Sequence, residues 1–298
     1  MIQLYHRSTQ TFDTEIVAGE AWIRWLYETS SGKFLLEALV KRRFYSLLTG
    51  VFCDTRFSRR LIPGFIANYH IPMEESLEAA DTFPSFNAFF TRRLNPAARP
   101  FAADDAVLCS PGDGRLQVFP QINTERVWQI KGSAYRLQDL LQDAELTRKF
   151  TGGSCALLRL APVDYHRFHF IADGTAESSR RIRGSYYSVN PTALRQIYGV
   201  FAKNTRMLTV EHTETLGDIL YVEIGATSVG SIVQLQDEPH TVCRGEEKGF
   251  FKFGGSTILL FFEPGTVSFD EDLLAMTARG IESVVHAGEK IGQKQPEK

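Results

Sequence analysis

Cysteine is scarce in this chain of 298 residues, which has four cysteines and none in a C-x-x-C spacing. So few cysteines cannot build a disulfide scaffold, and their spacing argues against a cysteine-based zinc site. We expect reduced and mostly buried thiols at Cys53, Cys109, Cys155 and Cys243. An excess of one charge is also missing, since 33 Lys and Arg stand against 35 Asp and Glu. This balance excludes a globally basic nucleic-acid-binding protein, and we predict no nucleic-acid partner.

Long hydrophobic runs are absent as well. The longest uninterrupted apolar run covers residues 258–262, far short of the roughly 20 residues that a membrane-spanning helix needs. Polar and charged side chains interrupt residues 1–21, so this segment does not resemble a signal peptide. We therefore expect a protein of the cytoplasm, or one that sits on the cytoplasmic face of a membrane.

What the chain does contain predicts an α+β fold. Residues 1–100 carry apolar side chains at helical spacing, as in Ala21–Leu26 and in Phe34–Leu39, where Ser30 or Ser31 could cap the second helix. From about residue 105 the pattern changes to short strands separated by glycine and proline turns, which favours a barrel or sandwich. Ser268–Glu271 matches a capping box for one last helix, which Gly280 should end. We expect a helical region over 1–100 and a β-rich catalytic domain over 101–298.

The helical region also carries a local positive charge. Residues 41–60 contain six Lys and Arg against the single acidic residue Asp54, and Trp22 and Trp25 precede them. One interpretation is a solvated helix face beside an apolar stripe. The other is a surface that rests on anionic lipid, where each basic residue near the bilayer contributes about 1 kcal/mol.

A glycine-rich segment, Phe253-Gly254-Gly255-Ser256-Thr257, is the first candidate for chemistry. Taken alone it predicts a hairpin turn, because Gly-Gly supplies the positive φ values that such turns need. The alternative is that the Ser256 hydroxyl attacks the carbonyl of Gly255, because a strained turn can place the two groups in reacting geometry.

A serine of this kind needs a base and a group that orients the base. His166 and His169 lie close together after a predicted buried strand, and Asp113 lies in the turn Ser110-Pro-Gly-Asp-Gly114. Each has an ordinary structural use, and Asp between two glycines commonly makes a turn contact. Zinc ligation by His166, His169 and Asp113 is a rival interpretation, but we predict no metal site.

The order of these motifs resembles the phosphatidylserine decarboxylase proenzyme family of pyruvoyl-dependent enzymes. The resemblance runs from Phe86 to Phe262, whereas the first eighty residues match loosely, and Gly254 stands where many members carry Leu. The segments that carry it are Phe86–Leu94 with Ala98–Pro100, Ser110–Gly114, Ile130–Gly132, Leu160–His169, Asn190-Pro191, Asn204–Arg206, Gly225-Ala226, Val229-Gly230 and Lys248–Thr257.

The resemblance implies a zymogen that cuts itself between Gly255 and Ser256 into a β chain, 1–255, and an α chain, 256–298, which stay associated. It implies that Asp113, His169 and Ser256 form the self-cleavage triad and that position 256 becomes a covalent pyruvoyl group. That group would form a Schiff base with phosphatidylserine and release CO₂ to give phosphatidylethanolamine, with His166 as the proton donor or as a positioning residue.

A phospholipid substrate also implies a peripheral enzyme on the cytoplasmic face of the cell membrane. Arg92, Arg93 and Lys131 are candidate phosphate partners. Two other functions stay open at this point: the same self-processing scaffold acting on a soluble amino acid, or a non-enzymatic barrel-sandwich binding module. Association of whole chains into a homo-oligomer stays open as well.

Overall fold

A computed structural model describes the chain except for residues 1–2, 16–18, 42, 123–127, 131–132, 227–231, 255 and 297–298. Its centre is a large, mostly antiparallel sheet with the strand order β14-β9-β11-β12-β16-β7-β4-β18-β1-β2, and β10 pairs with β11. The bounds of these strands are β1 Gln3–His6, β2 Thr11–Thr14, β4 Gly114–Phe119, β7 Ser154–Leu160, β9 Gly174–Ala176, β10 Arg180–Ile182, β11 Arg206–Thr213, β12 Asp218–Ile224, β14 His240–Val242, β16 Ser256–Phe262 and β18 Glu282–Val285.

Three smaller sheets complete the β structure. Their orders are β13-β15-β8, β17-β19-β3 and β5-β6. Their strands are β3 Val107–Cys109, β5 Trp128–Ile130, β6 Ser133–Tyr135, β8 Arg167–His169, β13 Ile232–Gln234, β15 Glu247–Phe251, β17 Val267–Phe269 and β19 Lys290–Lys294.

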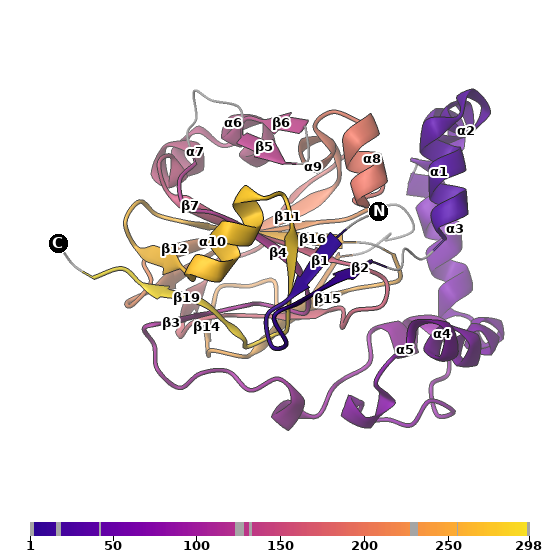
Figure 1. The fold of residues 1–298 in the computed structure, drawn as a ribbon, viewed down its shortest axis with the longest axis horizontal. Coiled ribbons are helices and arrows are strands. Elements are labelled where there is room, and N and C mark those ends of the chain that lie inside the picture. The colour runs from indigo at the N-terminus through magenta and orange to yellow at the C-terminus, as the bar shows by residue number, and fades with distance from the viewer. Residues whose placement is uncertain are drawn as a thin grey trace.

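Helices surround the sheets and form a separate column at one side of the molecule (Figure 1). The α-helices are α1 Glu20–Glu28, α2 Ser30–Leu35, α3 Arg43–Asp54, α4 Ile62–Tyr69, α5 Phe86–Phe90, α6 Leu137–Leu141, α7 Ala144–Phe150, α8 Pro191–Gln196, α9 Val200–Lys203 and α10 Glu271–Ala278. Shorter helices of other types are η1 Leu36–Val40, η2 Arg56–Leu61, η3 Met73–Glu75 and η4 Pro96–Ala98.

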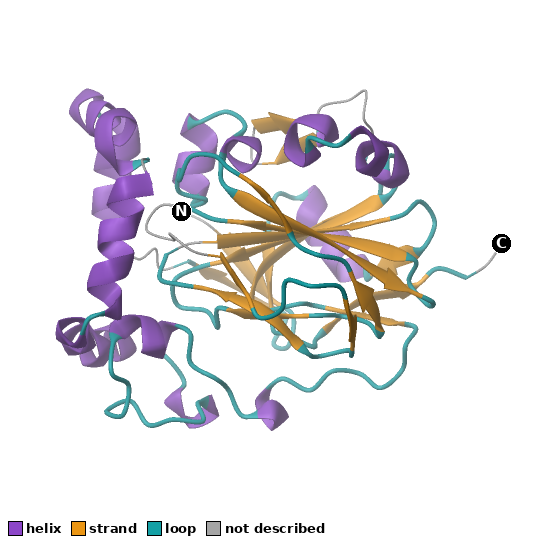
Figure 2. Ribbon diagram, turned by 180° about the vertical axis from the view of Figure 1, so that it is seen from behind, coloured by secondary structure: helices purple, strands orange, loops and turns teal. Residues whose placement is uncertain are grey.

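The main sheet has a hydrophobic core on each face. Along β16, Leu259 and Phe261 join a cluster with residues of α1, α6, α8 and α9, whereas Ile258 and Leu260 join a cluster with Phe168 of β8 and Phe251 of β15. Because strand side chains alternate between faces, one face is covered by helices together with the β5-β6 sheet, and the other by α10 and the sheets β13-β15-β8 and β17-β19-β3. Figure 2 shows these layers from behind.

The α+β fold with a sheet-rich domain is therefore confirmed, and the sandwich describes it better than the barrel. In the part of the chain that the structure describes, the main sheet runs as an open path from β14 to β2. The predicted helical start is correct from Glu20 onward, but residues 3–14 form β1 and β2, and β1 pairs in parallel with β18. The division near residue 100 stays a prediction.

Two predicted helix caps are wrong. Helix α2 is capped by Thr29, whose Oγ1 accepts the amide N–H of Gly32 at 3.0 Å. Ser30 and Ser31, the predicted caps, lie inside the helix. Ser268 lies in β17, and α10 begins after Asp270 without a side-chain cap. Gly280 does follow the end of α10, with φ of +72° as a C-terminal glycine requires. Three of the four cysteines are buried and all four are free, as expected.

Candidate functional site

The predicted site residues lie at one end of three neighbouring strands. β7 ends at Leu160, which pairs with Ser256 at the start of β16. On the other side of β7, β4 begins at Gly114, directly after Asp113. Antiparallel pairing thus brings three segments that are distant in the sequence to the same edge of the sheet.

The same edge connects the main sheet to a smaller one. After β7 the chain crosses to β8, which carries His169, and β8 pairs with β15. After β15 the chain crosses back through residues 252–255 to Ser256. The two crossings lie side by side, since the Phe251 amide donates to the carbonyl of His166 at 3.0 Å. The hairpin-turn interpretation of the glycine segment is therefore wrong, because β15 and β16 belong to different sheets.

Ser256 points into the space between the sheets. It shares a face of β16 with Ile258 and Leu260, whose side chains pack against the smaller sheets. The residue is fully buried, and its Oγ has no hydrogen-bond partner. The buried hydroxyls of Ser154, Thr257 and Ser283 also lack a partner, so Ser256 is distinguished by its place directly after the predicted scissile bond. Gly255, on the other side of the predicted scissile bond, lies outside the described residues.

His166 lies against the segment that precedes Ser256. Its ring centroid is 3.9 Å from that of Phe90, and its Nδ1–H donates to the carbonyl of Asp164 at 2.9 Å. The other ring nitrogen, Nε2, is buried and makes no hydrogen bond with the described residues, although the backbone of Gly254 is near enough to act on the ring. Burial lowers the pKa of His166 to about 4, although the backbone groups of Asp164 and Gly254 act in the opposite direction. His166 is therefore neutral at pH 7 and close to Gly254.

His169 has the same arrangement on β8. Its Nδ1–H donates to the carbonyl of Gly245 at 3.0 Å, and its Nε2 is buried without a partner. Burial lowers the pKa of this imidazole as well. The backbone amide of His169 donates to Pro111 at 2.8 Å, which fixes β8 to the turn that carries Asp113. A neutral imidazole whose Nδ1 is already committed can accept a proton at Nε2.

Asp113 does not orient His169 in this structure. Its carboxylate accepts Arg99 Nε at 2.8 Å and the Ala287 amide at 2.8 Å, and it pairs with His286 Nδ1 at 3.2 Å. Burial alone would raise the pKa of Asp113, but hydrogen bonds from His286 and Arg99 hold it at about 2. In place of the predicted contact with Asp113, His169 Nδ1 is bonded to the backbone carbonyl of Gly245. Asp113 instead fixes the turn 110–114 through Arg99 and the Ala287 amide.

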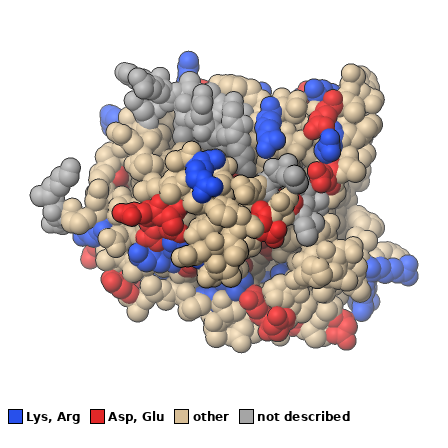
Figure 3. All heavy atoms as spheres, in the orientation of Figure 1, with Lys and Arg blue, Asp and Glu red and all other residues tan. Residues whose placement is uncertain are grey.

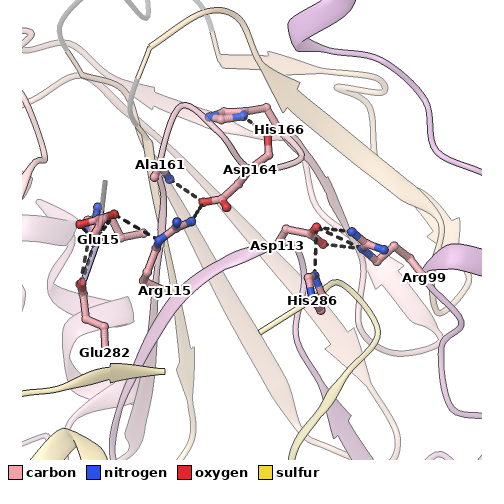
Figure 4. Close-up of polar contacts among 10 residues, drawn as sticks. Glu15, Arg99, Asp113, Arg115, Ala161, Asp164, His166, Glu282 and His286 are labelled. Atoms are coloured by element: carbon pink, nitrogen blue, oxygen red, sulfur yellow. Dashed lines mark hydrogen bonds and ion pairs between the residues drawn. The ribbon is translucent and has the colours of Figure 1, made fainter. Parts of the chain in front are cut away.

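Figure 4 shows the partners of Asp113 and of His166. Asp113 lies between Arg99 and His286, whereas His166 lies beside Asp164, whose carboxylate pairs with Arg115. The sequence reasoning missed Arg99 and His286 as partners of Asp113. Arg99 lies in a segment that carries the family resemblance, but His286 has only a weak signal, a polar residue directly after the apolar strand β18.

A metal site finds no support in this geometry. Among the described residues, no three His, Cys, Asp or Glu side chains are grouped so that they could hold a metal ion. Of the candidate phosphate partners, Lys131 lies outside the described residues, Arg93 is exposed and Arg92 is buried.

Comparison with known proteins gives consistent results over nearly the whole chain. Residues 86–293 match the family model described as phosphatidylserine decarboxylase. A phosphatidylserine decarboxylase proenzyme of Ruminiclostridium cellulolyticum is 49% identical over 292 residues, 98% of this chain and 97% of the relative. Proenzymes of the same description from Clostridium kluyveri and Clostridium novyi are 47% and 45% identical, and each comparison covers 99% of this chain and 99% or 100% of the relative.

Proposed function

This chain belongs to the phosphatidylserine decarboxylase family, and from that premise we propose that it removes the carboxylate of phosphatidylserine as CO₂ and leaves phosphatidylethanolamine. The observation that carries the proposal is the buried Ser256 Oγ at the start of β16, which has no hydrogen-bond partner among the described residues; His166 and His169 each have a buried Nε2 that also lacks one. A soluble amino acid as the substrate, or a binding module without activity, is not favoured by relatives that match from end to end.

The first step is self-cleavage between Gly255 and Ser256. The Ser256 Oγ attacks the carbonyl carbon of Gly255 while His169 Nε2 takes the hydroxyl proton, because Nδ1 of that ring is held by Gly245. The peptide C–N bond breaks and an ester remains. β-Elimination then breaks the Cβ–O bond of residue 256, which leaves a carboxylate on Gly255, and hydrolysis with loss of ammonia converts the remaining dehydroalanine to a pyruvoyl group.

The surroundings of residue 256 fit a pyruvoyl group. The Ser256 Oγ has no hydrogen bond among the described residues to lose when it departs, and the residue lies on the face of β16 that packs against β8 and β15. Such a group supplies a ketone that condenses with the substrate amine and accepts the electron pair released with CO₂. We assign His166 to the proton transfers: its Nε2 takes the proton that the substrate ammonium must lose, and returns it to the α-carbon after CO₂ has left.

The two products of cleavage should stay together. β16 and β18 belong to the α chain, yet β16 lies between β12 and β7, and β18 lies between β4 and β1. The five side chains 258–262 are almost fully buried, and burial of each stabilises the complex by roughly 1.5–3 kcal/mol. The β chain 1–255 and the α chain 256–298 are therefore expected to form one stable unit.

The assay combines fragment mass with product release. The wild-type chain should yield a C-terminal fragment lighter by one ammonia than the peptide 256–298, and should release CO₂ from phosphatidylserine vesicles. Ser256→Ala should stay uncut, and His169→Ala should cut far more slowly. His166→Ala should cut normally and fail to decarboxylate. An uncut wild-type chain that releases CO₂ would refute the mechanism.

We also propose that the helical column binds the membrane surface on the cytoplasmic face. On α3, the apolar residues Phe44, Leu47, Leu48, Val51 and Phe52 repeat at the spacing of an amphipathic helix, yet all five are exposed. Trp22 and Trp25 on α1, whose rings stack at 5.0 Å, are exposed as well. An apolar helix face without a protein partner is typical of a surface that contacts lipid.

Basic side chains lie beside this apolar surface. Arg56, Arg59 and Arg60 on η2 are exposed next to the exposed ring of Phe57. Figure 3 shows Lys and Arg at the lower right, at the foot of the column where Figure 1 draws α4. Arg42, which the sequence analysis counted with them, lies outside the described residues. Among the described helices, none has both the length and the apolar composition needed to cross a bilayer.

The column is joined directly to the catalytic segment. Asn87 on α5 donates from Nδ2 to Asp54 at the end of α3, and its Oδ1 accepts the backbone amide of Phe253 at 2.9 Å. Lys252 also pairs with Asp54 at 2.9 Å. A lipid that enters along the exposed apolar face of α3 would thus arrive next to Lys252 and Phe253, shortly before Ser256 in the chain.

Vesicle flotation tests the membrane contact. Leu48→Glu combined with Phe52→Glu should abolish binding to vesicles that contain anionic lipid, whereas Leu235→Glu, at an exposed apolar residue outside the column, should not. Deleting residues 1–60 is a poorer test, because it removes β1 and β2 from the main sheet. Unchanged flotation of the double variant would refute the proposal.

A further inference from the structure

Arg92 is a buried cation that forms no ion pair with any described residue. Burial lowers its pKa, although the carboxylates of Asp113, Glu75 and Asp164 are near enough to act in the opposite direction. The residue is 5% exposed, and its Nε is buried without a hydrogen bond. Its guanidinium lies over the ring of Phe89, 5.1 Å from the ring centroid. A buried charge normally has a counter-ion, because taking it out of water is costly.

Four other buried or half-buried arginines near the site bind carboxylates, whereas the buried Arg206 donates to backbone carbonyls. Arg99 binds Asp113, Arg115 binds Asp164, and Arg167 binds Glu247. Arg159 binds both Glu15 and Glu282. In the described part of the chain, no carboxylate within ion-pair distance serves Arg92, so its terminal nitrogens are available to an anion from outside.

Arg92 belongs to the wall of the catalytic centre. It follows α5, whose Phe90 ring packs on the His166 ring at 3.9 Å. The carbonyl of the preceding residue, Thr91, accepts Arg167 Nε of strand β8 at 2.9 Å. The charge is close enough to His166 to help lower its pKa. Arg92 thus directly follows residues that contact His166 and β8, and its guanidinium lies within electrostatic range of the His166 imidazole.

We propose that Arg92 binds the phosphodiester of the substrate. This inference rests on the proposed function and deepens it by naming the residue that recognises the phospholipid headgroup. Guanidinium suits a phosphodiester because its planar fork can donate two parallel hydrogen bonds to two oxygens.

The substrate carboxylate is the other oxyanion that could bind, and catalysis argues against it. Decarboxylation removes negative charge from the carboxylate as neutral CO₂ departs. A cation on that group would be bound more tightly in the ground state than in the transition state, which slows the reaction. The phosphodiester keeps its charge throughout, so a cation there anchors the substrate without raising the barrier.

Two soluble probes separate these sources. Glycerophosphoethanolamine carries the phosphodiester and the amine but no carboxylate, whereas L-serine carries the amine and the carboxylate but no phosphate. Titration calorimetry on the mature enzyme should show that Arg92→Gln binds glycerophosphoethanolamine roughly 10- to 100-fold more weakly than wild type, with L-serine unaffected. Arg93→Gln, which removes the same charge from the exposed neighbouring residue, should change neither affinity.

Several results would overturn the inference: equal affinity of Arg92→Gln and wild type for glycerophosphoethanolamine, no measurable binding to wild type, a loss for L-serine alone, or an equal loss for both probes. Should Arg92→Gln fail to self-cleave, Arg92→Lys replaces it. Lysine keeps the positive charge but lacks the planar pair of donors, so binding of glycerophosphoethanolamine should weaken roughly 3- to 10-fold. Unchanged binding would contradict the inference. A wild-type enzyme that releases no CO₂ from phosphatidylserine refutes the proposed function, whatever Arg92 does.

Discussion

Replacing Asp113 with Asn should destabilise the uncleaved chain by at least about 2 kcal/mol at neutral pH. The Asp113 carboxylate is nearly buried and bonded to Arg99, His286 and the Ala287 amide. These bonds hold its pKa at about 2, against an ordinary value of 3.8. At roughly 1.4 kcal/mol for each pH unit, that difference is worth roughly 2 kcal/mol. Asn cannot neutralise Arg99, which would keep only Glu75 as a partner.

The pH dependence has a definite sign. A carboxyl group with a depressed pKa contributes its full stability above the pKa of the unfolded chain, near 3.8. The contribution disappears as the pH falls from about 5 towards 2, because the folded state must then take up the proton that it excludes. The difference in stability between the parent chain and the Asp113→Asn variant should therefore be widest at about pH 6–7 and should narrow below about pH 4.

Urea unfolding in a Ser256→Ala background measures this difference on a single uncut species. Asp237→Asn is the control, because Asp237 is exposed and has no ion pair in the structure; it should change stability by less than about 0.5 kcal/mol. If Asp113→Asn were as stable as its parent at pH 7, or if the difference kept its size at pH 2–3, the assignment of Asp113 as a charged anchor would be wrong.

Three further predictions concern other buried groups. Burial raises the pKa of Glu211 from 4.5 to about 8, so the stability that the protonated form provides is full below about pH 4.5 and is lost as the pH rises from there to about 8; Glu211→Gln should reduce the fall in melting temperature over that range, and an unchanged profile would contradict this. Because burial lowers the pKa of His166 to about 4, the acid limb of decarboxylation on soluble glycerophosphoserine should lie nearer pH 4 than 6.5, and a limb at 6.5 would mean that the ring is solvated. Leu260→Ala in β16 should lower the free energy of unfolding by about 2–5 kcal/mol, measured by urea in the uncut background; a change below about 1 kcal/mol would mean that the strand is loosely packed.

Much of the strand pattern could be predicted from local sequence. The change to short strands from about residue 105 was expected, because strands such as β7, β12 and β16 are short, mostly apolar runs between turn signals. Strands β1 and β2 were missed. They are four residues long and mostly polar, and β1 is held by pairing with β18 from the other end of the chain, a contact that local pattern does not encode.

The site shows the same division. Ser256, His166 and His169 were recognisable because they lie in motifs with a definite order, and pairing at the strand ends then brings their segments together. The partners of Asp113 could not be found in this way, because Arg99 and His286 reach it from outside the motif. His169 Nδ1 is bonded to the backbone carbonyl of Gly245 and not to the carboxylate that was expected. A backbone carbonyl has no sequence signature, because every residue carries one.

The position of β16 in the middle of the main sheet links folding of the precursor to its later cleavage. The strand has neighbours on both sides, so the surroundings of residue 256 exist once the sheet is assembled, and we expect assembly to come before the break. Two pieces synthesised separately would each have exposed edges that are prone to aggregate. The intact precursor thus holds both edges together while the sheet forms.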